Sequence, residues 1–202
     1  YAIHFPLDNN NKRLSFGVNA GFQQFGFDHT SVITINPDPS VSSSANMLLT
    51  PLIGAGAWYH TKTWYAGISI DQLARNRWSD IGFASRFRIH TYFTTGTKLP
   101  INERFTLQPH VLFRVPPAGP ISADLNLMLD YNNILKFGLG YRNIDALIAF
   151  FRINLNQFSV GYSFEYITSA IQGGHWNTHE ISLFFNTCNN KKRSIDACPL
   201  FD

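Results

Sequence analysis

Apolar and polar residues alternate along most of this chain. Between residues 158 and 166 the alternation is strict, with apolar side chains on one side and small or acidic ones on the other: Phe158, Val160, Tyr162, Phe164 and Tyr166 against Ser159, Gly161, Ser163 and Glu165. Successive side chains of a strand point to opposite faces of a sheet, so a period of two residues indicates a strand. We therefore predict an all-β chain whose strands each have one apolar and one polar face.

The same alternation marks about eleven strands. They lie near residues 1–7, 13–27, 50–59, 62–70, 86–97, 104–114, 121–131, 134–142, 145–153, 158–166 and 179–187. The connections between these strands are of two kinds, which alternate along the chain. One kind is tight and polar, at 8–12, 60–62, 99–103, 131–133 and 154–157. The other kind, at 28–49, 71–85, 115–120, Asn143 and 167–178, is long except at Asn143. Short periplasmic turns and longer outer loops are typical of outer-membrane β-barrels, so this order favours a transmembrane antiparallel barrel.

Composition fits the same class. Charged residues make up 14% of the chain, against about 25% in an ordinary soluble domain. Mean hydropathy is only −0.09, and apolar runs such as 146–151 are far shorter than the roughly 18 residues of a membrane helix. A soluble β-sandwich or barrel is the alternative, but it gives no reason for loop lengths to alternate. The net charge of +3 is mild and scattered, so we expect no nucleic-acid partner.

The order of the connections also bears on completeness. If the tight turns are periplasmic, the first strand runs inward from the outside, whereas bacterial barrels have an even strand number and both ends in the periplasm. We therefore expect residues 1–187 to be the C-terminal part of a single longer barrel and residues 188–202 to be a periplasmic tail. Aromatic residues near strand ends are candidates for the girdles at the two membrane surfaces: Trp58, Tyr59, Trp64, Tyr65, Tyr131 and Tyr141.

Charged residues fall on the polar side of the predicted strands. We expect them to form a charge network in the barrel lumen, because charges removed from bulk water need partners: Asp124, Arg142, Asp145, Arg152, Glu165 and Glu180. The alternative is a selective pore or a binding site for an extended peptide.

No catalytic chemistry is predicted. Ser163, His179 and Glu180 are the residue types of a hydrolase triad. The alternation places His179 on the lipid-facing side of its strand and Ser163 on the other side, so we do not expect a triad. The other histidines show no metal-ligand spacing such as HExxH. We expect no catalytic residues, no metal and no cofactor.

Two further features lie in connecting segments. In the long connection at 167–178, Gly173, Gly174, His175 and Trp176 are a candidate contact for a surface partner, the alternative being a Trp176 that packs on its own barrel rim. Cys188 and Cys198 are a candidate disulfide pair, because the periplasm is oxidising; the alternative is two free thiols in the tail. The basic run at 191–193 is a periplasmic contact or a solvated turn.

Several stretches together resemble a known family: LSFGVNAGFQQFGFD, GAWYHTKTWYAGISI, VPPAGPISADLNLML, GLGYRNIDALIAFFRIN and GYSFEYITSAIQGGHWNTHEISL. They are similar to the PorP/SprF family of the type IX secretion system, the last stretch most specifically. The segment at 115–126 is one residue longer than the usual family form, and the tail after residue 187 has no counterpart in the resemblance.

The resemblance implies an outer-membrane barrel of about fourteen strands, of which about eleven lie in this chain. It further implies a place in the secretion and gliding-motility apparatus of Bacteroidota. Its partners would be outer-membrane lipid, other components of that apparatus and a secreted surface adhesin, which the barrel would help to export or anchor. A channel for small solutes and a soluble ligand-binding barrel are the alternatives.

Overall fold

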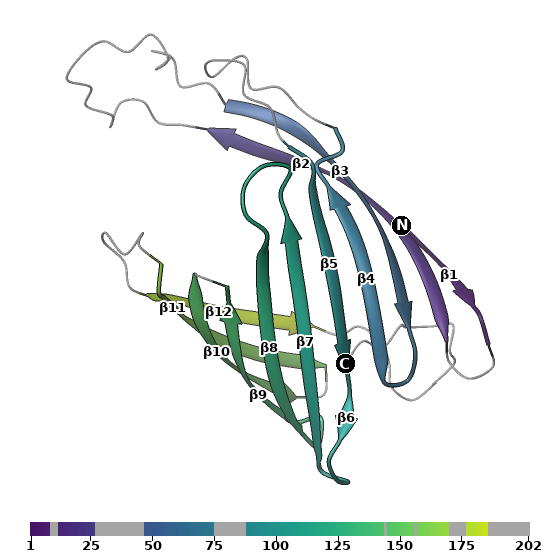
Figure 1. The fold of residues 1–202 in the computed structure, drawn as a ribbon, viewed down its shortest axis with the longest axis vertical. Coiled ribbons are helices and arrows are strands. Elements are labelled where there is room, and N and C mark those ends of the chain that lie inside the picture. Colours follow the sequence, from purple (N-terminus) through teal and green to yellow (C-terminus); the bar gives the residue numbers. More distant parts are fainter. Residues whose placement is uncertain are drawn as a thin grey trace. The chain divides into compact units, whose positions relative to one another are not determined.

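Twelve β-strands and no helix make up the described part of the chain (Figure 1). The computed structural model describes residues 1–8, 12–26, 47–74, 88–143, 145–155, 157–169 and 177–185. The strands are β1 (Ala2–Pro6), β2 (Arg13–Gly26), β3 (Met47–His60), β4 (Trp64–Asp71), β5 (His90–Thr97), β6 (Leu99–Pro100), β7 (Phe105–Val115), β8 (Ser122–Tyr131), β9 (Leu135–Arg142), β10 (Ala146–Leu155), β11 (Phe158–Ile167) and β12 (Asn177–Phe185). Within these ranges, no helix is long and apolar enough to cross a membrane.

The strands pair in the order in which they follow one another along the chain. The order is β1-β2-β3-β4-β5-β7-β8-β9-β10-β11-β12, with β6 pairing to β7 off this path. The predicted all-β antiparallel class is therefore confirmed. β1 and β12 are the end strands of the order, and the described residues contain no pairing between them. That residues 1–187 are the C-terminal part of a longer barrel, with 188–202 as its tail, stays a prediction.

Ten of the eleven predicted strands agree with the observed ones to within three residues at each end. The exception is β5, which begins at His90 instead of residue 86. The two-residue β6 is not among the predicted strands, because the whole of 99–103 is predicted as one tight polar connection. The turn is in fact displaced toward β7: Leu99 and Pro100 pair with Leu107 and Thr106. The Asn102 side-chain oxygen instead accepts hydrogen bonds from the backbone N–H groups of Arg104 and Phe105, at 2.9 and 2.8 Å.

The turn between β8 and β9 shows how a tight connection sets the strand register. Asn132 and Asn133 have φ angles of 53° and 56°, a left-handed conformation that asparagine tolerates in turns, and the Ile134 N–H donates a hydrogen bond to the Tyr131 carbonyl at 2.9 Å. Asp130 closes the turn by accepting a hydrogen bond from the Asn133 N–H at 2.9 Å. Tyr131 then pairs with Leu135 and Asp124 with Arg142. The turn residues 130–133 thus set the register of β8 and β9, and with it which side chains face each other along both strands.

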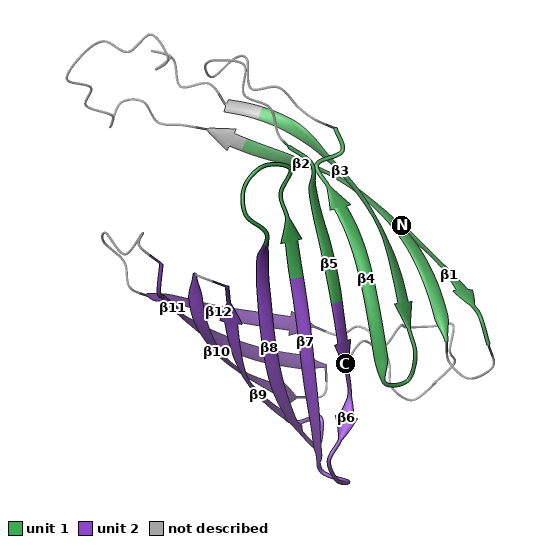
Figure 2. Cartoon of the chain, viewed as in Figure 1, with its two compact units in different colours: residues 1–94, 113–121 green, residues 95–112, 122–202 purple. Residues whose placement is uncertain are grey.

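The chain divides into two compact units (Figure 2). Unit 1, residues 1–94 and 113–121, contains β1 to β4, in which β2 and β3 pair along their whole length from Arg13–His60 to Gly26–Met47. On one face of β3 and β4, the Trp58 ring lies over Gly67 and stacks on Tyr65, with centroids 4.8 Å apart. Tyr59 and Trp64 meet on the other face at 5.6 Å. Trp58 and Tyr65 therefore cannot belong to the same girdle as Tyr59 and Trp64, because neighbouring side chains of a strand point to opposite faces.

Unit 2, residues 95–112 and 122–202, contains β6 and β8 to β12. Pairings between neighbouring strands align residues in rows, one of which joins Asp130, Lys136, Arg152, Gly161 and Ser182. Two glycines of β9 leave room on this face for larger neighbours. The Phe150 ring covers Gly138, and the Asn126 side chain covers Gly140. A side chain at either glycine would collide with that neighbour.

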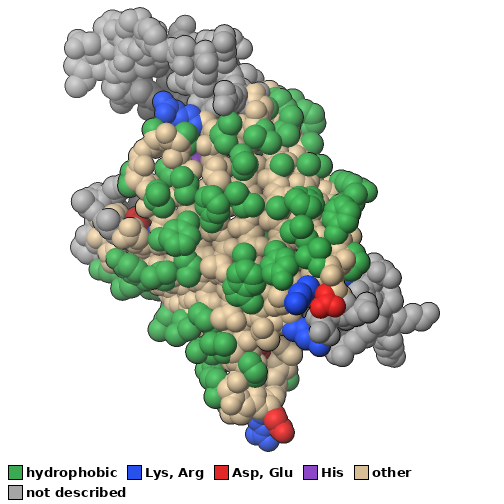
Figure 3. All heavy atoms as spheres, turned by 45° about the vertical axis from the view of Figure 1, so that its right-hand side comes forward, with side chains coloured by type: hydrophobic (Ala, Val, Ile, Leu, Met, Phe, Trp, Pro, Cys, Tyr) green, Lys and Arg blue, Asp and Glu red, His purple; other side chains and the backbone are tan. Residues whose placement is uncertain are grey.

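The two faces of the strands have the reverse of a soluble protein's polarity. Apolar side chains lie exposed on one face, among them Phe22, Leu139, Ile181 and Leu183 at 76, 70, 74 and 79%. Hydrophobic side chains spread over the face shown in Figure 3, while the Lys, Arg, Asp and Glu side chains in view lie toward its edges. On the opposite face, Asp124, Asp130 and Lys136 are buried, whereas Ala146 is the one buried hydrophobic residue among those described. We call the exposed apolar face outward and the polar face inward.

Candidate functional site

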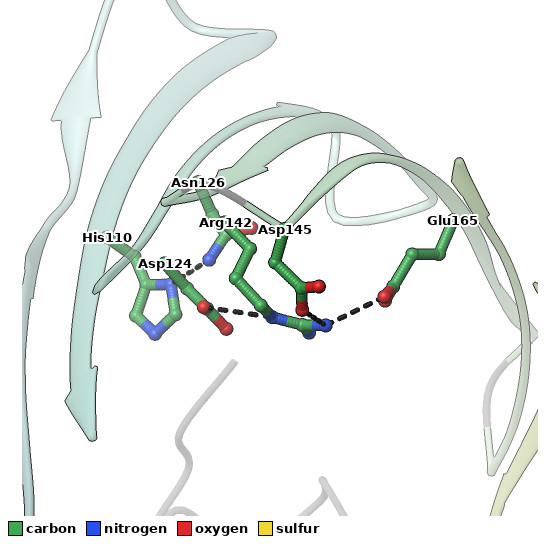
Figure 4. Close-up of polar contacts among 6 residues, drawn as sticks. All are labelled: His110, Asp124, Asn126, Arg142, Asp145 and Glu165. Carbon is green, nitrogen blue, oxygen red and sulfur yellow. Dashed lines mark hydrogen bonds and ion pairs between the residues drawn. The ribbon is translucent and has the colours of Figure 1, made fainter. Parts of the chain in front are cut away.

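Arg142, the last residue of β9, is the centre of a charged group on the inward face (Figure 4). Its Nε lies 3.2 Å from Asp124 Oδ1, and its Nη1 lies 3.5 Å from Asp145 Oδ2 and 2.7 Å from Glu165 Oε1. We call these four residues the Arg142 network. The structure thus brings together four of the six residues that sequence analysis predicted for a lumen charge network.

Strand register explains how residues from four segments meet. Asp124 of β8 is directly opposite Arg142, and Asp145 lies across the short connection that follows β9. Glu165 is on β11, with β10 between it and β9. The β10 residue opposite Arg142 is the fully buried Ala146. Because alanine has so short a side chain, the guanidinium extends past it and reaches the carboxylate on the far side.

The Arg142 network contains three carboxylates and one guanidinium. The side chain of Asp124 is 7% exposed, Arg142 21%, Glu165 26% and Asp145 46%. A buried carboxylate without a cation is costly, so Arg142 compensates chiefly Asp124 and Glu165, while the more exposed Asp145 gains less. The network keeps an excess of negative charge at this end of the strands.

Backbone hydrogen bonds join the same segments. The Asn143 N–H donates to the Ala123 carbonyl at 2.8 Å, and the Asp145 N–H donates to the Arg142 carbonyl at 3.1 Å. Thr168 and Ser169, which follow β11, both donate their N–H groups to the Asp145 carbonyl, at 2.7 and 3.2 Å. The Arg142 network therefore lies where the β11–β12 connection leaves the sheet, and the backbone of Asp145 holds the first residues of that connection.

A second charged group lies at the other end of β8 and β9. Lys136 Nζ is 3.4 Å from Asp130 Oδ2, and the two side chains are only 4 and 3% exposed. Gln108 Nε2 adds a hydrogen bond to the same carboxylate oxygen at 3.3 Å. Beside the Arg142 network, Asn126 Nδ2 lies 3.2 Å from His110 Nδ1. These residues are not among the six predicted for the lumen charge network, although they have the inward parity, which is the signal in the sequence that identifies them.

The remaining two predicted charges have other partners. Arg152 donates from Nη2 to Ser159 Oγ at 3.2 Å, and its guanidinium lies 4.4 Å from the centroid of the Phe184 ring. The ring reaches it because Gly161 of the intervening strand has no side chain. Glu180 accepts a hydrogen bond from Ser182 at 3.1 Å. Both are on the inward face but outside the Arg142 network.

The residues of the hydrolase hypothesis do not converge. Ser163 is opposite Glu180 on the inward face, whereas His179 lies on the outward face and bonds to Tyr162 Oη through Nδ1 at 2.7 Å. The part of the chain that the structure describes contains no group of three or more His, Cys, Asp or Glu residues that could hold a metal ion. The predicted contact residues Gly173, Gly174, His175 and Trp176, and the candidate disulfide Cys188–Cys198, lie outside the described residues.

An antiparallel sheet with an exposed apolar face and buried charges on the other face is of the kind that outer-membrane β-barrels have. Comparison with known families agrees with this class. The family model of the type IX secretion system membrane protein PorP/SprF matches residues 1–185. The chain therefore belongs to the PorP/SprF family and is a membrane component of the type IX secretion system. No curated protein and no solved structure matches the chain.

Proposed function

We propose that this chain crosses the outer membrane repeatedly as part of a β-barrel that supports export or surface anchoring of a secreted adhesin, without catalysis of its own. Membership in a family of secretion-system membrane proteins supports the general role. It also argues against the soluble ligand-binding barrel that the sequence left open.

Strand length and polarity support repeated crossing. β8, β10 and β11 have 10 residues each, and β12 has 9. Tilted strands of about 9 to 11 residues span the hydrocarbon layer of a bilayer. Lipid would contact the outward face, where Leu125, Leu127 and Leu147 are about half exposed, at 49, 50 and 51%. The inward face would line the lumen.

The observation that carries the adhesin role is the position of the Arg142 network. The backbone carbonyl of Asp145, a residue of this network, accepts hydrogen bonds from Thr168 and Ser169, at the start of the connection in which the sequence predicts a partner contact at Gly173 to Trp176. A rigid base is what a binding loop needs, since ordering a loop only upon binding costs free energy. We therefore assign the network the role of holding this connection for the partner.

The test compares cells that produce the native protein, Arg142→Gln and Lys12→Gln, the last as a control because Lys12 lies exposed near a tight turn. Surface proteins released by protease from intact cells are quantified by mass spectrometry, and barrel assembly is followed by heat-modifiable migration on gels. We expect one large secreted protein to fall severalfold in R142Q cells with the barrel still assembled. An unchanged surface proteome in cells that lack the whole barrel would refute the adhesin role.

A channel for small solutes is the second candidate function, because charges of both signs line the inward face. Conductance of the purified protein in planar bilayers separates the two. A steady open pore whose ion selectivity changes with Glu165→Gln supports the channel. Absence of conductance, together with a change in the surface proteome, supports the anchoring role.

A further inference from the structure

Arg152 of β10 is a cation that has no anionic partner in the described part of the chain. It is directly opposite Lys136 of β9 on the inward face. Lys136 already pairs with Asp130 at 3.4 Å, so this end of the face has one carboxylate for two cations. Like charges directly opposite each other on neighbouring strands destabilise a sheet. The excess charge here is positive, the reverse of that in the Arg142 network.

The Arg152 guanidinium is held in a defined position and keeps donors that the described residues do not use. Its Nη2 donates to Ser159 Oγ at 3.2 Å, and its Cζ lies 4.4 Å from the centroid of the Phe184 ring. A guanidinium has several N–H donors in one rigid plane, and this is the one hydrogen bond that the described residues give it. Its Nε is buried without a hydrogen-bond partner among them. A buried donor left unsatisfied costs free energy, so the guanidinium is prepared for an acceptor.

The position beside Arg152 on the next strand is occupied by Gly161 and can hold a further group. Gly161 of β11 is opposite Arg152. A Cβ added to Gly161 would have its nearest heavy atoms among the described residues at 3.6 to 3.7 Å, which is ordinary van der Waals contact. At Gly138 of β9, by contrast, the Phe150 ring already fills the corresponding space. A carbon-sized group therefore fits over Gly161, next to the guanidinium, without a collision.

We propose that Arg152 is the centre of an anion-binding site on the inward face, and that its ligand is a carboxylate. The two oxygens of a carboxylate match the planar fork of an arginine, and such charge-assisted hydrogen bonds are among the strong ones. A single carboxylate would also bring Asp130, Lys136 and Arg152 together to neutrality. A free organic acid and an acidic side chain of a polypeptide share this chemistry. The site does not depend on the adhesin role, because it requires only that the ligand reach the inward face.

Saturation-transfer NMR on the purified full-length protein tests the site, with acetate as the probe. Arg152→Gln removes the proposed contact, and Arg104→Gln is the control, because Arg104 lies exposed in a turn. We expect an acetate signal that saturates with concentration for the native protein and R104Q. The signal should be weaker by about tenfold or more for R152Q, since hydrogen bonds between charged groups are lost. An acetate signal in R152Q equal to that of the native protein would overturn the proposal.

A second variant places a carboxylate in the site from the chain itself. Gly161→Glu puts an acidic side chain opposite Arg152, while Gly161→Ala adds only the Cβ that the position accepts. We expect G161E to lose the acetate signal and G161A to keep it. The heat-modifiable band reports whether each barrel assembles, and G161E decides if R152Q does not assemble, because it retains the arginine. Unchanged acetate binding in the assembled G161E protein contradicts the proposal.

The source of the carboxylate is identified with two short peptides that have blocked ends and differ only in one residue, glutamate or glutamine. Tighter binding of the glutamate peptide than of acetate assigns the site to a polypeptide ligand. Equal binding of the two assigns it to a free organic acid. Binding of the glutamine peptide as tight as that of the glutamate peptide would argue against a carboxylate ligand.

Discussion

Arg142 and Glu165 form an ion pair 2.7 Å long although a whole strand, β10, separates the strands on which they lie. The pair exists because Ala146 is the β10 residue beside Arg142. Its long reach couples the ends of β9 and β11 directly.

Arg142→Gln should lower the free energy of unfolding by about 2 to 4 kcal/mol, because it leaves the buried Asp124 carboxylate without its cation. Asp145→Asn is the matched control, since Asp145 is 46% exposed and such surface pairs contribute about 0 to 1 kcal/mol. Urea titration of the protein refolded in lipid vesicles measures both. Equal effects of the two variants would contradict the ranking by burial.

Ala146→Leu tests the gap through which Arg142 reaches Glu165. We expect the larger side chain to block the guanidinium and to cost about 1 to 3 kcal/mol, as overpacking of a filled site does. A double-mutant cycle with Glu165→Gln should then give a coupling free energy, because both changes disturb one interaction. Strict additivity of the two substitutions would argue against the geometry.

Gly138→Ala should destabilise unit 2 by about 1 to 3 kcal/mol through collision with the Phe150 ring. Gly21→Ala is the control. Gly21 occupies the same kind of strand position, but a Cβ added to it would have no neighbouring heavy atom within 4 Å. The double variant Gly138→Ala with Phe150→Leu should recover part of the loss. Urea midpoints in vesicles report all three, and a G138A midpoint equal to that of G21A would be inconsistent with a filled site.

Leu139→Arg separates a lipid-facing surface from a water-facing one. At 70% exposed, Leu139 in a soluble protein would tolerate arginine with little change. Facing lipid, the substitution should cost about 2 to 4 kcal/mol near the bilayer midplane and less toward its surfaces. Glu103→Arg in an exposed turn is the control. The yield of folded protein in vesicles is the measurement, and wild-type yield for L139R would argue against lipid contact.

Strand positions and faces could be predicted from the sequence because they depend on local alternation. Contacts across several strands could not. Whether Arg142 meets Glu165, or Arg152 meets Phe184, depends on small residues at Ala146 and Gly161, on strand register, and on turns such as Asn132–Asn133. The predicted roles of Trp176 and of Cys188–Cys198 concern residues outside the described part and stay predictions.

The scarcity of buried hydrophobic residues, with Ala146 the one found among those described, bears on how this chain reaches its membrane. Burial of apolar surface inside the protein is the main force that folds chains in water, and these strands offer little of it. In the membrane arrangement that we propose, transfer of the outward side chains into lipid supplies that force instead. We expect the newly exported chain to aggregate in the aqueous periplasm unless a chaperone holds it unfolded, so that folding and insertion occur as one event.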